Sequence, residues 1–92
     1  MNRADAVDMT RKFWNEYTIG RPEYWEDQQP RMVAHPAFGD ADDDIVVLCE
    51  IDSSASEDDP ELLHLATRAM DALRVAHPEL GAFPVTFELC VP

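Results

Sequence analysis

The chain has 92 residues, of which 46% are hydrophobic and 28% are charged, with 19 acidic residues against seven lysines and arginines. This length allows a single domain, residues 1–92, with a small core, and the apolar content is too high for a disordered chain. The formal net charge of -12 repels phosphate backbones and anionic lipid, which argues against direct binding to nucleic acid or to a membrane.

Residues 3–19 are predicted to form an amphipathic helix. Asn2 can cap its first turn, and Gly20 is a suitable stop. An apolar stripe at three- and four-residue spacing predicts the face that turns toward the core. The stripe consists of Ala6, Met9, Phe13 and Tyr17, with Trp14 at its margin.

A polar connector, residues 20–30, follows this helix and contains Tyr24 and Trp25 between two prolines and among acidic residues. Two interpretations of the aromatic pair stay open. In one, the two rings cover the open end of a small core. In the other, they form an aromatic anchor rimmed by acid, which is typical of an interface hot spot facing a basic partner.

Two strands are predicted in the middle of the chain. Residues 32–35 are a weak candidate, residues 39–44 read as a turn, and residues 45–51 form an almost continuous apolar run typical of a central strand. Val46 and Leu48 would lie on the face of the sheet away from the helices. That face needs a cover, either from the connector or from a second copy of the chain in a homodimer.

The last third of the chain predicts a helix and a strand. Asp59 can cap the helix with Pro60 at its first position, and Pro78 lies beyond its end. Residues 83–91 then alternate between apolar and polar side chains, which indicates a strand. The order α-β-β-α-β predicts an α+β two-layer sandwich, in which two helices pack on one face of a small mixed three-stranded sheet.

The negative charge is concentrated in one part of the chain. Between Met32 and Thr67 there is no lysine or arginine, and ten acids fall in the 22 residues from Asp40 to Glu61. The predicted strand at residues 45–51 divides these acids into two clusters about 20 Å apart, at about 3.3 Å per residue. A basic protein surface, a cationic ligand or a divalent metal would complement them.

Motifs for catalysis and for metal binding are missing from the sequence. Asp40-x-Asp42-x-Asp44 begins like a calcium loop, but Ile45 and Ile51 stand where that loop needs glycine and glutamate. The histidines lack ligand spacing, and there is neither a phosphate loop nor a nucleophile motif. We therefore expect no enzyme activity, no cofactor and no metal. For the turn at Asp40–Asp44, a solvated loop is the favoured interpretation and a weak divalent site stays open as the alternative.

The two cysteines are predicted to stay reduced. Cys49 and Cys90 fall on opposite faces of the predicted sheet, which is incompatible with disulfide geometry. The first residues also lack the apolar segment of a secretory signal. Both observations favour a cytoplasmic location.

Together these features predict a non-enzymatic protein-binding module that engages a basic partner. An inhibitor fits best, such as an immunity protein, an antitoxin or a nucleic-acid mimic, because complementary charge speeds encounter and selects the partner. The expected contact residues are Tyr24, Trp25, Asp42, Asp43, Asp44, Glu57, Asp58 and Asp59. The alternatives are a small structural or adaptor domain, homodimeric or not, whose acids only solvate loops, and a salt-adapted or metal-buffering protein.

Overall fold

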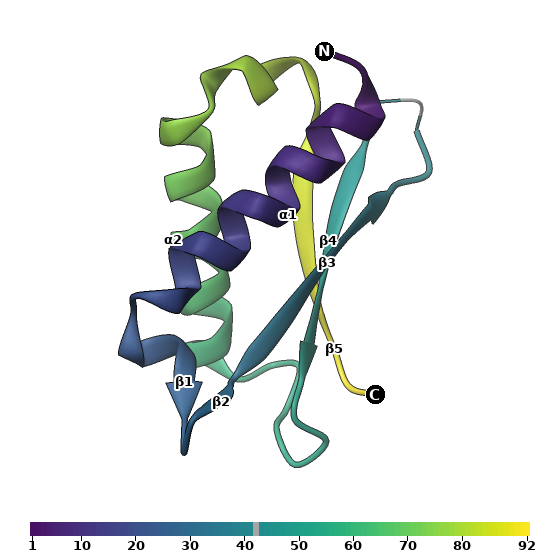
Figure 1. The fold of residues 1–92 in the computed structure, drawn as a ribbon. Helices are drawn as coiled ribbons and strands as arrows, with labels where there is room; N and C mark the ends of the chain where they lie inside the picture. The colour runs from purple at the N-terminus through teal and green to yellow at the C-terminus, as the bar shows by residue number, and fades with distance from the viewer. Residues whose placement is uncertain (42) are drawn as a thin grey trace.

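The computed structural model describes residues 1–41 and 43–92. The main elements follow the predicted order and confirm the α+β class (Figure 1). They are α1 (Arg3–Ile19), β3 (Met32–Phe38), β4 (Ile45–Ile51), α2 (Pro60–Ala76) and β5 (Val85–Cys90). Four short elements complete the fold, namely η1 (Pro22–Tyr24), β1 (Trp25–Glu26), β2 (Gln29–Pro30) and η2 (Pro78–Ala82). Within the described ranges, no helix has the length and apolar character needed to cross a membrane.

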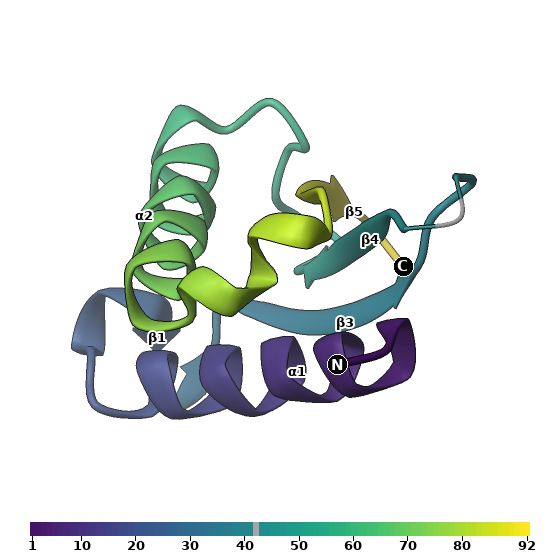
Figure 2. The same ribbon diagram turned by 90° about the horizontal axis from the view of Figure 1, so that it is seen from above.

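The main sheet has the strand order β3-β4-β5, with β4 in the centre. β3 runs antiparallel to β4, whereas β5 runs parallel to it and is reached through α2. Figures 1 and 2 show α1 and α2 crossing the same face of this sheet, α1 beside β3 and α2 on the side of β5. The result is the predicted two-layer arrangement, in which one face of the sheet carries no helix among the described residues.

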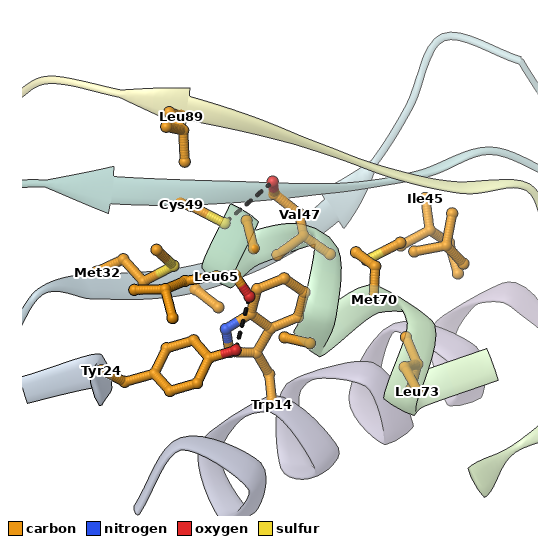
Figure 3. Packing of buried hydrophobic residues seen from close by; sticks show 14 of the residues in the cluster. Trp14, Tyr24, Met32, Ile45, Val47, Cys49, Leu65, Met70, Leu73 and Leu89 are labelled. Carbon is orange, nitrogen blue, oxygen red and sulfur yellow. Dashed lines mark hydrogen bonds between the residues drawn. The ribbon is translucent and has the colours of Figure 1, made fainter. Parts of the chain in front are cut away.

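The core lies between the sheet and the two helices (Figure 3). Ile45, Val47 and Cys49 alternate along β4 toward the helices and are fully buried. Residues in register with them on β5 extend the same layer, because side chains on paired strands share a face. α2 contributes the apolar face that its spacing predicts, consisting of Leu62, Leu65, Ala66, Ala69, Met70 and Leu73.

Both long helices begin as predicted. The side-chain oxygen of Asn2 accepts a hydrogen bond from the backbone N–H of Asp5 at 2.8 Å. The carboxylate of Asp59 accepts from the N–H groups of Glu61 and Leu62, at 2.9 and 3.4 Å. These side chains satisfy donors that the first turn of a helix leaves without a partner.

The buried stripe of α1 differs from the predicted one. Its fully buried members are Ala6, Val7, Thr10 and Trp14. Met9, Phe13 and Tyr17, which were expected to lead the stripe, are half-buried and pack at the edge of the core. The helix is rotated because Trp14 is its largest side chain, and Thr10 can join it in the core by donating its hydroxyl to the Ala6 carbonyl at 2.8 Å.

The third strand in chain order also differs from its prediction, because β3 continues through Pro36 to Phe38. Pro36 pairs with Val47 in the register of the sheet. A proline lacks the N–H that a central strand must donate, but β3 is an edge strand with one side unpaired, so the proline is tolerated. β3 passes through Pro36 without interruption and ends at Phe38, just before the turn that begins with Gly39.

Candidate functional site

The connector folds into a small hairpin that the sequence did not predict. Trp25 pairs with Pro30 and Glu26 with Gln29, so the loop between the strands contains only Asp27 and Gln28. Both loop residues have positive φ angles, 50° and 66°. Two successive residues in this conformation are typical of a type I′ turn. The turn leaves the acids Glu26 and Asp27 exposed at the tip of the hairpin.

Tyr24 lies inside the molecule and is only 1% exposed. Its hydroxyl donates a hydrogen bond of 2.6 Å to the main-chain carbonyl of Leu65 on α2 (Figure 3). Burial, with a further contribution from Tyr17, holds the pKa of Tyr24 well above its usual value. A tyrosine in this position covers the core, which agrees with the first of the two interpretations of the aromatic pair Tyr24 and Trp25. Because it cannot reach a partner, we leave it out of the candidate surface.

Trp25 is half-buried and is held at the end of α1. Its indole Nε1 donates to the carbonyl of Thr18 at 2.8 Å, and the ring packs against the core. The exposed part of the ring borders a shallow apolar hollow together with Ile19 and Pro22. Trp25 can therefore contribute to a contact surface, although it also has a structural role.

The hairpin brings its acids to those of the loop that follows β4. Glu26 and Asp27 line one hollow of about 420 Å³ together with Asp52 and Asp59. We call the four acids that line this hollow, together with the two exposed acids between them in the loop after β4, the lower acid cluster. Glu26, Asp27, Asp52 and Asp59 line the hollow, whereas Glu57 and Asp58 belong to the loop and do not line it. Sequence reasoning missed that Glu26 and Asp27 belong to it, because their place depends on the hairpin.

The single base that lines this hollow is already engaged. Arg31 donates to the Glu61 carboxylate at 2.6 Å and to the Glu23 carbonyl at 3.2 Å. This ion pair lowers the pKa of Glu61 and raises that of Arg31. Glu26 and Asp59 also raise the pKa of Arg31 through their charge, so this one base offsets part of the charge of the four acids that line the hollow.

Several acids of the lower cluster also have local structural roles. Asp52 accepts hydrogen bonds from the N–H and hydroxyl of Ser54 at 2.8 and 2.7 Å, which lower the pKa of Asp52. Glu57 accepts from the backbone N–H of Val91 at 3.4 Å, and Asp59 caps α2. These contacts hold the carboxylates of Asp52, Glu57 and Asp59 in place. Asp58 is exposed, as Asp52 and Glu57 are.

The turn between β3 and β4 forms the upper acid cluster, which consists of Asp40, Asp43 and Asp44. Arg3 on α1 holds the turn, donating to the carbonyls of Asp44 and Gly39 at 3.1 and 2.7 Å. Asp40 and Asp43 are exposed, whereas Asp44 is half-buried. Asp42, which was expected to join this contact surface, lies outside the described residues.

The two acid clusters lie at opposite ends of β4, as the sequence predicts (Figure 1). They do not form one continuous acidic patch, because the central strand β4, which is seven residues long, lies between them. A partner can contact one cluster alone, or it can contact both by lying along the sheet.

The site offers charge rather than reactive groups. In the described part of the chain, no group of three or more histidines, cysteines and acids is placed to hold a metal ion. Cys49 and Cys90 are both free thiols. Burial raises the pKa of Cys49 to about 12, which keeps it protonated and unreactive at neutral pH.

Comparison with families of known proteins, with curated protein sequences and with solved structures gives no match to this chain.

Proposed function

We propose that this chain is a non-enzymatic protein-binding domain that engages a basic surface of another protein. The observation that carries the proposal is the lower acid cluster. Two segments about 25 residues apart in the chain, the hairpin and the loop after β4, place their carboxylates around one hollow. Like charges brought together in this way destabilise the free domain, and a partner that supplies lysines and arginines relieves the repulsion.

An inhibitor is the use of such a surface that we favour. Net charge of one sign steers a basic partner toward the acidic face and speeds association. A domain of 92 residues bound over a basic cleft would block a nucleic-acid site or an active site. Immunity proteins, antitoxins and nucleic-acid mimics act in this way. We place this activity in the cytoplasm, where both free thiols stay reduced.

Affinity capture from a lysate of the source organism, followed by identification of the bound protein, tests the proposal. The association rate with the purified partner should fall at least about tenfold between low and physiological salt, because screening shortens the reach of the charges. Asp58→Lys and Asp43→Lys should slow association further. Glu16→Lys, an equal change of charge at an exposed position on α1, is the matched control.

Association that is insensitive to salt would overturn the proposal. So would a partner without a basic surface. A rate that falls equally for Glu16→Lys and for Asp58→Lys would show that only overall charge matters, and it would remove the lower acid cluster as the contact site.

A further inference from the structure

The face of the sheet opposite the two helices, called the open face here, is apolar at its centre. Val46 and Leu48 on β4 are half-buried there by their neighbours, and Val33 on β3 is 40% exposed. The strand register places the following side chains on this face: Val33, His35, Ala37, Val46, Leu48, Glu50, Thr86, Glu88 and Cys90. A two-layer fold leaves such a strip without a cover.

The connector does not supply that cover. Tyr24 turns its ring toward α2, on the opposite side of the sheet. The hairpin formed by β1 and β2 lies at the end of the molecule, below α1 (Figure 1). Seen from above, the side of the sheet away from the helices carries no element among those that the structure describes (Figure 2).

Charge is divided between the two layers of the molecule. Residues 32–59 and 77–92, which form the sheet, its adjoining loops and η2, hold eleven acids and no lysine or arginine. The remaining residues, which form the two long helices and the connector, hold eight acids and all seven bases. The open face itself carries Glu88 and Glu50, of which Glu50 lies 3.9 Å from His35 on the same face. The upper and lower acid clusters lie beyond the two ends of β4, so the acids of this layer complement a basic partner.

A second copy of this chain is a poor occupant of the open face. Two copies would bring together surfaces of the same charge, each on a chain of net charge -12. Three strands about 4.8 Å apart and about 23 Å long form a strip about 14 Å wide. One α-helix, about 10–12 Å wide, matches this strip, and about 15 residues at 1.5 Å each would span β4.

We propose that the open face binds a basic amphipathic helix of the partner protein. The apolar stripe of this helix lies on Val46 and Leu48. The lysines or arginines of the helix lie on either side of that stripe, beside Glu50 and Glu88. The two ends of the helix lie beside the acids that directly precede and follow β4, Asp44 of the upper cluster and Asp52 of the lower cluster. This inference rests on the proposed function and deepens it, because one partner element then spans both clusters.

The test uses a synthetic helical peptide of about 15 leucine and lysine residues with one leucine stripe. A second peptide has the same composition in an order that forms no stripe. Binding is measured by titration of a labelled peptide, and the contact site is mapped by amide chemical shifts of the full chain. The striped peptide should bind at least about tenfold more tightly, and it should shift amides of β3, β4 and β5.

Two variants of the chain locate the binding. Leu48→Lys should weaken binding of the striped peptide at least about tenfold, because it removes apolar contact and adds a like charge. Leu48→Thr is the second variant, for use if Leu48→Lys fails to fold. It keeps a residue that favours strands, and it should weaken peptide binding in the same direction but by a smaller factor. Val75→Lys is the matched control, since Val75 is 84% exposed on α2, in the other layer.

The outcomes separate this inference from the proposed function. Equal binding of both peptides leaves the proposed function in place and overturns the open-face site. Shifts confined to α1 and α2, or equal losses in Leu48→Lys and Val75→Lys, also overturn it. A chain that sediments as a dimer until Leu48 is replaced assigns the face to a second copy instead. Binding of neither peptide at low salt counts against both proposals.

Discussion

Tyr24 connects three parts of the molecule through one side chain. Its ring meets the ring of Tyr17 on α1 edge-on, with 5.7 Å between centroids, and its hydroxyl donates to Leu65 on α2. The connector, which has little regular structure, is tied in this way to both helices. A tyrosine is suited to the position because its ring fills the core while its hydroxyl satisfies a buried carbonyl.

Replacement of this residue should affect stability in a pH-dependent way. Tyr24→Phe should lower the free energy of unfolding by about 0.5–1.5 kcal/mol at pH 7, because it removes one hydrogen bond. The folded state holds the pKa of Tyr24 above the unfolded value of about 10. The corresponding stability is present below pH 10 and is lost as the pH rises above it. The natural chain should therefore lose stability more steeply than Tyr24→Phe between about pH 10 and 11.

Urea unfolding at each pH measures this difference. Cys49, whose pKa is also raised, contributes to alkaline loss equally in both proteins, so the comparison isolates Tyr24. Parallel curves for the two proteins over this pH range would contradict the role assigned to the buried hydroxyl.

At the scale of elements, the turn from β3 to β4 is closed tightly by its own backbone. The N–H of Gly39 donates to the carbonyl of Asp44 at 2.9 Å. A side chain at position 39 would meet the Cβ of Asp44 at 2.7 Å and a methyl group of Val46 at 3.2 Å. Glycine is thus required here by close approach of the opposite strand.

Gly39→Ala should lower the free energy of unfolding by about 1–3 kcal/mol, because the turn must open to admit the methyl group. Gly20→Ala is the control, since a Cβ at position 20 has nothing within 4 Å, and its effect should stay within about 0.5 kcal/mol. Urea midpoints at unchanged m value measure both. Equal effects of the two substitutions would contradict the proposed close contact.

The sequence could predict α2 almost to the residue, because its cap, its first-turn proline and its apolar spacing all agree. It could not predict the β1–β2 hairpin. Each strand has two residues, and Asp27-Gln28 is not one of the sequences that favour a type I′ turn. The buried stripe of α1 was also ambiguous, since two overlapping stripes have helical spacing and only packing selects between them.

The candidate site, like the fold, could be predicted from the sequence only in part. Exposure of Asp43 and Asp58 follows from their place in polar loops, and their separation follows from the length of β4. The meeting of Glu26 with Asp52 depends on tertiary contacts that no local pattern encodes. Tyr24 was ambiguous for a related reason, since an aromatic residue beside acids suits both a buried anchor and an exposed one.

At the scale of the whole molecule, unbalanced charge should make stability depend on salt. The chain carries a net charge of -12 within extents of 37, 27 and 18 Å. At 0.01 M salt the screening length is about 30 Å, so acids repel across the entire molecule, whereas at 1 M it is about 3 Å. The division of charge between layers concentrates this repulsion along the sheet.

The thermal midpoint should therefore rise by several degrees between about 0.01 and 1 M sodium chloride, in line with about 1 kcal/mol of relieved repulsion. The chain should nevertheless stay folded at the lower concentration, as judged by circular dichroism. Unfolding on removal of salt would favour a salt-adapted protein instead. Calcium chloride at equal ionic strength is the control, and a larger rise with calcium would indicate a bound cation rather than screening.

The position of the two acid clusters also has a consequence for the chain before it folds. β4 is its most apolar strand, and it stays without its parallel neighbour until α2 and β5 have been synthesised. An unpaired strand of this kind is prone to associate with the same strand of another chain. Aspartates directly before and after β4 act as gatekeepers, since stacking of nascent chains would bring like charges together at both ends. The charge that we assign to partner recognition thus also keeps newly made copies apart.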